Sequence, residues 1–337
     1  MPFLQKYMTW LDESFKQENG LYAVPVSASS VTNAPRKDAY YPLDFNACMA
    51  INASYMSALG DILNDKELSF IYKKMYFSIK TRINSLMWDN DTGFYYDLDK
   101  DGNKLSVKSI AAYWTMLAEV PNADKADRLV EHLNDPNSFG TEHPFPTLSA
   151  DDPHFSEDGM GYCGSVMPAF NFMVIKGLEK YGQYELAREC AIRHLYFVLE
   201  TLMPNEKNEP GDLYEAYLPN KEGRATCESD PKFARSRYVL TAGLSTIALM
   251  IENVIGLSIS LPRKTVDWII PNLEIMGIEN LSLKRNLITI LSNKSTRGWE
   301  IQMESEKLYY FTINIIDQKQ KTLPIPSGKC SMLIDKL

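Results

Sequence analysis

The sequence predicts a mainly α-helical domain followed by a small antiparallel β-domain, and three observations lead to this fold class. Before residue 257, apolar side chains recur every three or four residues in about eight segments, which is the spacing of one helix face. After Gly256, β-branched and aromatic runs replace that pattern. The length of 337 residues accommodates one large and one small domain. We therefore expect a helical domain over residues 1–257 and a β-sandwich-like domain over residues 258–337.

The strongest helical pattern lies between Asp65 and Trp88. Asn64 and Glu67 are spaced as in a capping box, which would begin this helix. The other helices are expected at Phe3–Phe15, Phe45–Leu63, Val107–Val120, Lys125–Leu133, Val166–Tyr181, Glu185–Met203 and Tyr238–Val254. No strand pattern of comparable strength interrupts these segments, so the first domain is predicted to be all-α.

Three runs predict the strands of the second domain. Leu287–Leu291 is rich in β-branched residues, and apolar side chains alternate with polar ones along Trp299–Glu304. Leu308–Ile316 is aromatic and β-branched, and Ser305–Lys307 provides a short turn before it. These strands are expected to form a structural cap on the helical domain.

The composition disfavours several classes of partner. A formal net charge of −8 disfavours nucleic acid and anionic membrane surfaces, which both attract basic proteins. The longest apolar stretch, near Leu244–Ile251, is too short to span a bilayer, and the first residues lack the pattern of a secretion signal. We expect a cytoplasmic protein, or a periplasmic one if a signal was removed. The five cysteines show no C-x-x-C spacing, so neither a disulfide framework nor a zinc site is expected.

Four long loops combine aromatic rings with carboxylates and histidines. Sugars suit such loops because their C–H faces stack on aromatic rings while their hydroxyl groups need directional partners. Plain structural loops can also be rich in tyrosine, so the composition favours carbohydrate without establishing it. The loops are Gly20–Leu43, Trp88–Asp99, Phe139–Tyr162 and Gly211–Gly223.

Two of these loops and the segment that follows the third loop carry motifs of a known group. Trp88–Asp97 is similar to a W-x-x-x-T-G-F-Y-Y-D segment, Pro146–Phe155 to a P-S-x-x-x-D-D-P-x-F/Y loop, and Gly164–Leu178 to G-P-V-W-x-x-x-N-Y-M-V-I-x-G-L. In this order they resemble the bacterial members of the trehalase and processing α-glucosidase clan, including the mannosylglycerate-hydrolase-like group. The resemblance implies an (α/α)6-toroid-like barrel that hydrolyses α-glycosidic bonds with inversion. About eight helices are fewer than a full barrel needs, so the resemblance implies an incomplete barrel that lacks its first helices.

The resemblance assigns the catalytic base to Glu215. An inverting glycosidase needs two carboxyl groups about 6.5–9.5 Å apart, one to protonate the leaving oxygen and one to activate water. Residues Tyr214–Gly223 are similar to the family's E-x-Y-D-P-x-T-G, whose glutamate is that base. On spacing alone, Glu215 is more simply explained as an exposed loop glutamate, and the family resemblance favours the base.

The acid position departs from the family. Ser29–Arg36 is similar to E-S-G-x-D-N-S-P-R, but Thr32 stands where the acidic aspartate belongs. An alcohol cannot act as a general acid near neutral pH. Asp44 is a possible substitute acid, although it could also be a helix-start residue.

The resemblance also implies a set of sugar contacts and one weakened subsite. Cys163 replaces the family's arginine, while Tyr162 and Met167 replace two tryptophans, which should weaken or change sugar recognition. The expected substrate-binding residues are Asn33, Arg36, Tyr96, Glu142, Asp152, Tyr162, Cys163 and Tyr217.

Two functions remain open from the sequence. The first is an inverting α-glycoside hydrolase, similar to an α-glucosidase or trehalase, that acts on small glycans. The second is a catalytically impaired descendant that binds carbohydrate or serves as a scaffold. An epimerase or lyase would need a histidine pair in the pocket, for which His143 and His154 are candidates. No cofactor and no metal site are expected. The Asp97–Gly102 run is similar to the first half of a calcium loop, but Lys108 stands where such a loop ends in glutamate.

Overall fold

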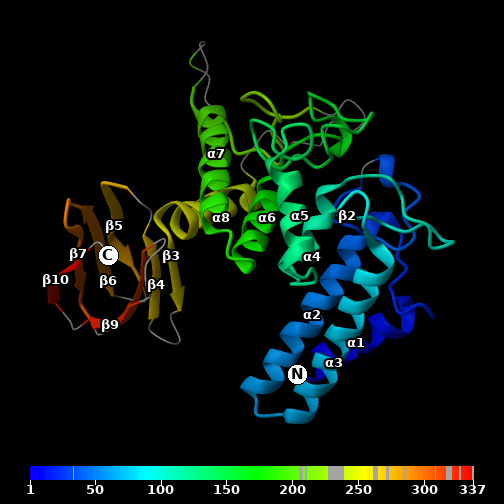
Figure 1. The fold of residues 1–337 in the computed structure, drawn as a ribbon, viewed down its shortest axis with the longest axis horizontal. Helices are drawn as coiled ribbons and strands as arrows, with labels where there is room; N and C mark the ends of the chain where they lie inside the picture. The colour runs from blue at the N-terminus through cyan, green and yellow to red at the C-terminus, as the bar shows by residue number, and fades with distance from the viewer. Residues whose placement is uncertain are drawn as a thin grey trace. The chain divides into compact units, whose positions relative to one another are not determined.

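The computed structural model describes residues 1–32, 34–204, 208, 211–226, 239–260, 265–270, 273–283, 286–307, 309–315, 321–325 and 328–335. These residues form two compact units, Met1–Ser245 and Thr246–Leu337 (Figure 1). Within the described ranges, no helix is both long enough and apolar enough to cross a membrane.

The first unit is helical, as the sequence predicts. Its helices are α1 (Pro2–Phe15), α2 (Leu43–Ile62), α3 (Lys66–Arg82), α4 (Trp114–Leu117), α5 (Ala123–Asn134), α6 (Pro168–Lys180), α7 (Tyr184–Leu202) and α8 (Leu240–Leu249), which crosses the boundary between the units. Single turns are η1 (Val26–Ala28), η2 (Ala34–Arg36), η3 (Ile83–Met87), η4 (Ile110–Tyr113) and η5 (Met160–Tyr162), and β1 (Trp88–Asp89) pairs with β2 (Phe94–Tyr95).

Helix pairs build the first unit. The helices α2 and α3 form a long hairpin, which is plain in Figure 1, and α6 packs against both α4 and α7. Small side chains line the buried face of α2, where Ala47, Ala50 and Ala53 are fully buried and allow close helix approach. The amphipathic pattern of the sequence therefore identifies both the helices and their inward faces.

Two local expectations differ from the structure. The side chain of Asp65 caps α3 by accepting a hydrogen bond from the backbone N–H of Leu68 (3.0 Å), while Asn64 lies in the left-handed region with φ 56°. The predicted helix Val107–Val120 is reduced to η4 and α4, because Ser109 pairs with Leu148 in an antiparallel bridge before the helical turns begin. The long loops thus replace part of a helix that periodicity alone predicts.

The second unit contains two four-stranded sheets. One has the order β10-β7-β6-β5, and the other has the order β3-β4-β8-β9. The pairs are antiparallel, as expected, except that β4 and β8 run parallel. The strands are β3 (Leu257–Ser260), β4 (Thr265–Ile270), β5 (Ile275–Ser282), β6 (Leu287–Lys294), β7 (Gly298–Ser305), β8 (Tyr309–Ile315), β9 (Lys321–Ile325) and β10 (Gly328–Asp335), preceded by the helical turn η6 (Met250–Ile255).

Both sheets contribute to one apolar core. On β7, the predicted alternation is confirmed, since Trp299, Ile301 and Met303 are buried and the residues between them are exposed. They belong to the same cluster as Val266 and Trp268 of the opposite sheet. The turn after β7 moves the chain to the other sheet, because β7 pairs with β6 and β10 whereas β8 pairs with β4 and β9.

Candidate active site

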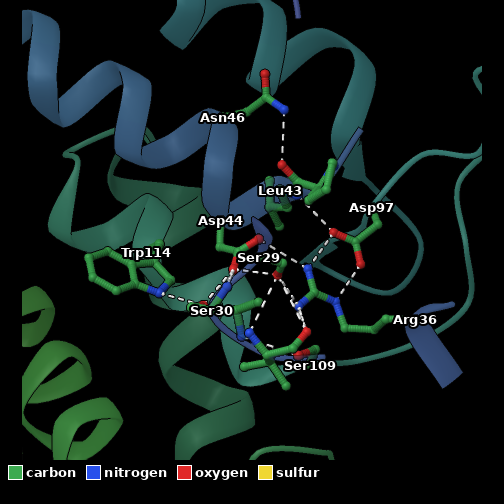
Figure 2. A network of polar contacts seen from close by, with 12 residues as sticks. Ser29, Ser30, Arg36, Leu43, Asp44, Asn46, Asp97, Ser109 and Trp114 are labelled. Carbon is green, nitrogen blue, oxygen red and sulfur yellow. Dashed lines mark hydrogen bonds and ion pairs between the residues drawn. The ribbon is translucent and has the colours of Figure 1, made fainter. Parts of the chain in front are cut away.

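The first two of the four long loops are joined by a buried ion-pair network. Arg36 bonds Asp97 through two nitrogens, at 2.7 Å for Nε to Oδ2 and 2.9 Å for the terminal nitrogen to Oδ1. Asp97 also accepts a hydrogen bond from the backbone N–H of Leu43, and Tyr41 pairs with Leu98 in an antiparallel bridge. Figure 2 shows Asp97 between the Arg36 guanidinium and the backbone of Leu43. The Gly20–Leu43 and Trp88–Asp99 loops are therefore held as one body.

Arg36 has no donor left for a sugar. It is fully buried, and its remaining N–H groups bond Ser29 Oγ (2.7 Å), the carbonyl oxygen of Val31 (2.5 Å) and Asp44 Oδ1 (3.1 Å). All five N–H donors of the guanidinium are thus used within the protein. Burial alone would lower the pKa of Arg36, but the two carboxylates raise it above its ordinary value. These contacts favour an internal role over the sugar contact expected from the sequence.

Asp44 is the second carboxylate of this network. It is the second residue of α2 and accepts hydrogen bonds from Ser29 Oγ (2.7 Å), from the backbone N–H of Ser30 (2.6 Å) and from Ser30 Oγ. Burial opposes its ionisation, but the ion pair with Arg36 and the serine hydrogen bonds prevail and lower its pKa. Asp44 is therefore ionised at neutral pH.

The residue at the family's acid position lies on the same loop. Thr32 is exposed, one residue after Val31, whose carbonyl oxygen binds Arg36. Asn33, expected to bind substrate, lies outside the described residues. The network thus fixes the loop around Thr32 but leaves the Thr32 side chain in contact with solvent.

The other two loops form a short antiparallel ladder. Val166 pairs with both Pro146 and Tyr217, and Tyr217 pairs in turn with Arg224. Thr147 Oγ1 adds a hydrogen bond to the carbonyl oxygen of Tyr162 (2.7 Å). The Phe139–Tyr162 and Gly211–Gly223 loops are therefore tied to each other at their centres.

One segment connects the two loop pairs. Trp114 Nε1 donates to Ser30 Oγ (3.1 Å) in the first pair, while the backbone N–H of Ile110 donates to the carbonyl oxygen of Thr147 (3.1 Å) in the second. Ser109 and Trp114 appear beside the Arg36 network in Figure 2. All four loops are therefore linked through hydrogen bonds within the first unit.

The base candidate lies on a tightly held part of the fourth loop. Glu215 is half-buried, and the next residues, Ala216 and Tyr217, are fully buried. The backbone N–H of Tyr214 donates to the phenolic oxygen of Tyr217 (3.0 Å). This bond links the residues on either side of Glu215 and Ala216. A half-buried carboxylate on a fixed backbone can be reached by a water molecule, and its backbone keeps one position.

The remaining predicted contacts are placed differently. Tyr217 is fully buried, and Tyr96 is nearly so, with its hydroxyl group bonded to Thr92 (3.1 Å). Cys163 is buried as well. Glu142 is exposed and Tyr162 is half-buried, so solvent reaches both residues.

Asp152 is hydrogen-bonded to a neighbouring histidine. One of its oxygens accepts from the backbone N–H of His154 (2.8 Å) and lies 3.0 Å from its Nδ1. The Asp-Asp-Pro loop that the sequence singles out is therefore locally ordered by its own side chains.

Sequence reasoning missed the residues that hold the loops in place. Asp97 ends the Trp88–Asp97 motif, but its pairing with Arg36 is 61 positions away and leaves no local pattern. His194 falls on the apolar side of α7 with Ala187, Ala191 and Val198, and a histidine at that spacing is a usable signal of a buried polar contact.

Comparison with known proteins identifies the family. Residues 1–230 match the sequence model described as "Mannosylglycerate hydrolase MGH1-like glycoside hydrolase domain", and residues 256–337 match the trehalase C-terminal domain. An uncharacterized protein of Borreliella burgdorferi is 56% identical over 338 residues, which cover 100% of this chain and 71% of that protein. The cytosolic neutral trehalase of Kluyveromyces lactis is 30% identical over 131 residues, 37% of this chain and 17% of the trehalase.

Solved structures share the fold. A structure described as a sialidase aligns with a TM-score of 0.70 at 16% identity, covering 88% of this chain and 28% of its own. The mannosylglycerate hydrolase of Thermus thermophilus, described in complex with glucose, aligns with a TM-score of 0.58 at 18% identity, covering 74% of this chain and 67% of its own. The matched region thus spans less than a third of the sialidase and less than a fifth of the yeast trehalase.

The fold is that of the six-hairpin glycosidases, and the sequence expectation of this fold class is confirmed. The chain belongs to the mannosylglycerate hydrolase MGH1-like glycoside hydrolase family, within the trehalase type of glycosidase.

Proposed function

We propose that this chain is an inverting α-glycoside hydrolase domain, of the α-glucosidase or trehalase kind, that acts on small glycans with Glu215 as its general base. The observation that carries the proposal is the state of Glu215, which is half-buried on a backbone fixed by the Val166–Tyr217 bridge and the Tyr214–Tyr217 hydrogen bond. Such a carboxylate can activate a water molecule from the face of the sugar opposite the leaving group. The family membership supports the same reaction class.

Neither candidate residue for the general acid can donate a proton to the leaving oxygen. Thr32 stands at the family's acid position, and its hydroxyl group cannot protonate a leaving oxygen near neutral pH. Asp44 is ionised, because Arg36 and two serines stabilise the charged form, so it has no proton to donate. We assign Asp44 to holding the loop, and hydrolysis then requires an acid from another carboxyl group or a leaving group that needs none.

A second candidate function follows from the same two residues. A domain with Thr32 at the acid position and an ion-paired Asp44 would bind carbohydrate without turning it over. The exposed Glu142 and the half-buried Tyr162 would then serve recognition alone.

One experiment separates the two functions. Product release is measured from trehalose, α-glucosides and α-mannosides with the unmodified chain, with Thr32→Asp and with Glu215→Gln, and proton NMR follows the anomeric form of the first product. Hydrolysis by the unmodified chain that Glu215→Gln abolishes, with an inverted product, supports the hydrolase. Activity that appears only in Thr32→Asp supports the binding domain.

Binding completes the test. Calorimetric titration of the same sugars into the inactive Glu215→Gln variant reports whether the surface holds carbohydrate independently of turnover. Binding without hydrolysis by any variant supports the second function, and the absence of both binding and hydrolysis contradicts both.

A further inference from the structure

A buried pair of histidines lies behind the loop that carries Glu215. His143 comes from the Phe139–Tyr162 loop and His194 from the middle of α7, and both side chains are fully buried. His143 Nε2 is 2.7 Å from His194 Nδ1, which is a hydrogen-bond distance. Burial lowers the pKa of His143 well below its ordinary value and that of His194 to about 3, so both rings are neutral near pH 7.

The hydrogen-bond partners assign the protons of this pair. His143 Nδ1 lies 3.1 Å from the carbonyl oxygen of Leu218, which can only accept, so Nδ1 carries the hydrogen. Nε2 of the neutral ring is then an acceptor, and His194 Nδ1 must be the donor to it. His194 Nε2 is left as a bare acceptor with no hydrogen-bond partner among the described residues. His194 therefore holds His143 in the tautomer that donates to Leu218.

His143 contacts the fourth loop in three ways. Besides the bond to Leu218, its backbone N–H donates to the carbonyl oxygen of Pro219 (2.8 Å). Its ring lies 5.8 Å from the ring of Tyr217, the residue whose hydroxyl group receives the N–H of Tyr214. Glu215 lies between Tyr214 and Tyr217 in sequence, so a shift of Tyr217 would displace its backbone.

The other side of the pair keeps His143 in place. Phe197 of α7 stacks on the His143 ring with centroids 4.8 Å apart and an angle of 4° between the planes. Arg193, one turn earlier, donates to the carbonyl oxygen of Thr141 (2.5 Å), and its positive charge also disfavours protonation of His143. The pair is thus held by α7 and by its own loop together.

We infer that His143 is a positioning residue for Glu215 and that His194 fixes the tautomer through which it acts. The inference rests on the proposed role of Glu215 as the base. Neither histidine touches the substrate, since both are fully buried, and their effect passes through the carbonyl oxygens of Leu218 and Pro219.

Two substitutions at one position test the inference. His143→Phe keeps the shape that stacks on Phe197 but removes the donor to Leu218. His143→Asn retains a donor at the place of Nδ1. We expect His143→Phe to lower kcat about tenfold or more, because small displacements of catalytic groups have effects of this size, with KM changed less than about twofold. His143→Asn should recover a substantial part of kcat.

A stability control separates positioning from general weakening. Ser57 donates a buried hydrogen bond from α2 to the carbonyl oxygen of Ser69 (3.0 Å), far from the loops in sequence, so Ser57→Ala should lower thermal stability without lowering kcat. Equal kcat losses in His143→Phe, His143→Asn and Ser57→Ala would overturn the inference.

Amide hydrogen exchange gives a readout that needs no activity. Peptides covering residues 211–225 should exchange faster in His143→Phe than in the unmodified chain, and His143→Asn and Ser57→Ala should stay close to it. If the unmodified chain hydrolyses no sugar, the proposed role of Glu215 as the base is contradicted. Faster exchange confined to His143→Phe would still support the role of His143 in holding this loop in position. Unchanged exchange at residues 211–225 in His143→Phe would overturn it.

Discussion

Arg36 and Asp97 form a bidentate ion pair that spans 61 positions of the sequence, with nitrogen-to-oxygen distances of 2.7 and 2.9 Å. The two side chains are almost completely buried. Parallel N–H···O bonds between a guanidinium and a carboxylate fix orientation as well as distance. The pair therefore sets the position of the Thr32 loop relative to the Trp88–Asp97 motif.

Removing the charge of Asp97 should destabilise the first unit strongly. Asp97→Asn leaves the buried Arg36 with Asp44 as its one carboxylate partner among the described residues, and breaking a buried pair typically costs about 3–5 kcal/mol in the free energy of unfolding. Urea denaturation followed by far-UV circular dichroism measures the change. As a control, Lys180→Gln breaks the exposed pair with Glu119 and should change stability by about 0–1 kcal/mol. Similar losses in the two variants would contradict the role given to Asp97.

Asp44 should make the fold sensitive to acid. Its pKa is lowered in the folded state, so it contributes stability above the unfolded pKa of about 3.9, and this contribution is lost as the pH falls through the folded value. The urea concentration at the denaturation midpoint of the unmodified chain should therefore decrease once the pH is lowered below about 4. Asp44→Asn should be less stable at pH 7, and its acid limb, the decline of stability with falling pH, should be shallower. Parallel acid limbs in the two proteins would show that Asp44 ionises alike in the folded and unfolded states.

The sequence predicts the helices because each buries one periodic face, and it predicts β7 because Trp299, Ile301 and Met303 alternate with polar residues. The same local logic fails at Val107–Val120. There, Ser109 and Ile110 make hydrogen bonds to the Thr147–Leu148 segment, and these distant contacts replace the first turns of the predicted helix. Periodicity reports which side chains are apolar and does not report where backbone groups find their partners.

The sequence predicts which loops carry the candidate site residues, but not the contacts that these residues make. Motifs place Glu215 and Thr32 on two loops, and the structure finds both side chains at least partly open. Whether Arg36 binds sugar or Asp97 depends on an acceptor 61 residues away, which no short motif contains. Burial likewise depends on long-range packing. Glu142 is exposed and Tyr217 is buried, although the sequence predicts that both contact substrate.

The hydroxyl group of Tyr217 should matter more for turnover than for stability. Tyr217→Phe removes the acceptor of the Tyr214 N–H, and the loss of one such bond costs about 0.5–1.5 kcal/mol. The backbone on one side of Glu215 loses its tether, so kcat in the assay above should fall by a larger factor than the fraction of folded protein. Tyr196→Phe, on an exposed part of α7, is the matched control and should leave both quantities unchanged. An unaltered kcat in Tyr217→Phe would show that the tether does not orient Glu215.

Replacing Gly256, which precedes β3 in the second unit, should lower thermal stability strongly. It has φ +89°, and a Cβ atom placed there would lie 2.1 Å from the carbonyl oxygen of Ile269 in β4, the strand that pairs with β3. Gly102 has a similar φ of +84° but no atom within 4 Å of such a Cβ. Both alanine variants therefore carry the cost of a left-handed residue, about 1–2 kcal/mol, and only Gly256→Ala adds a backbone clash. Calorimetry should show a clearly larger fall in the melting temperature for Gly256→Ala, and equal falls would mean that β4 moves aside without cost.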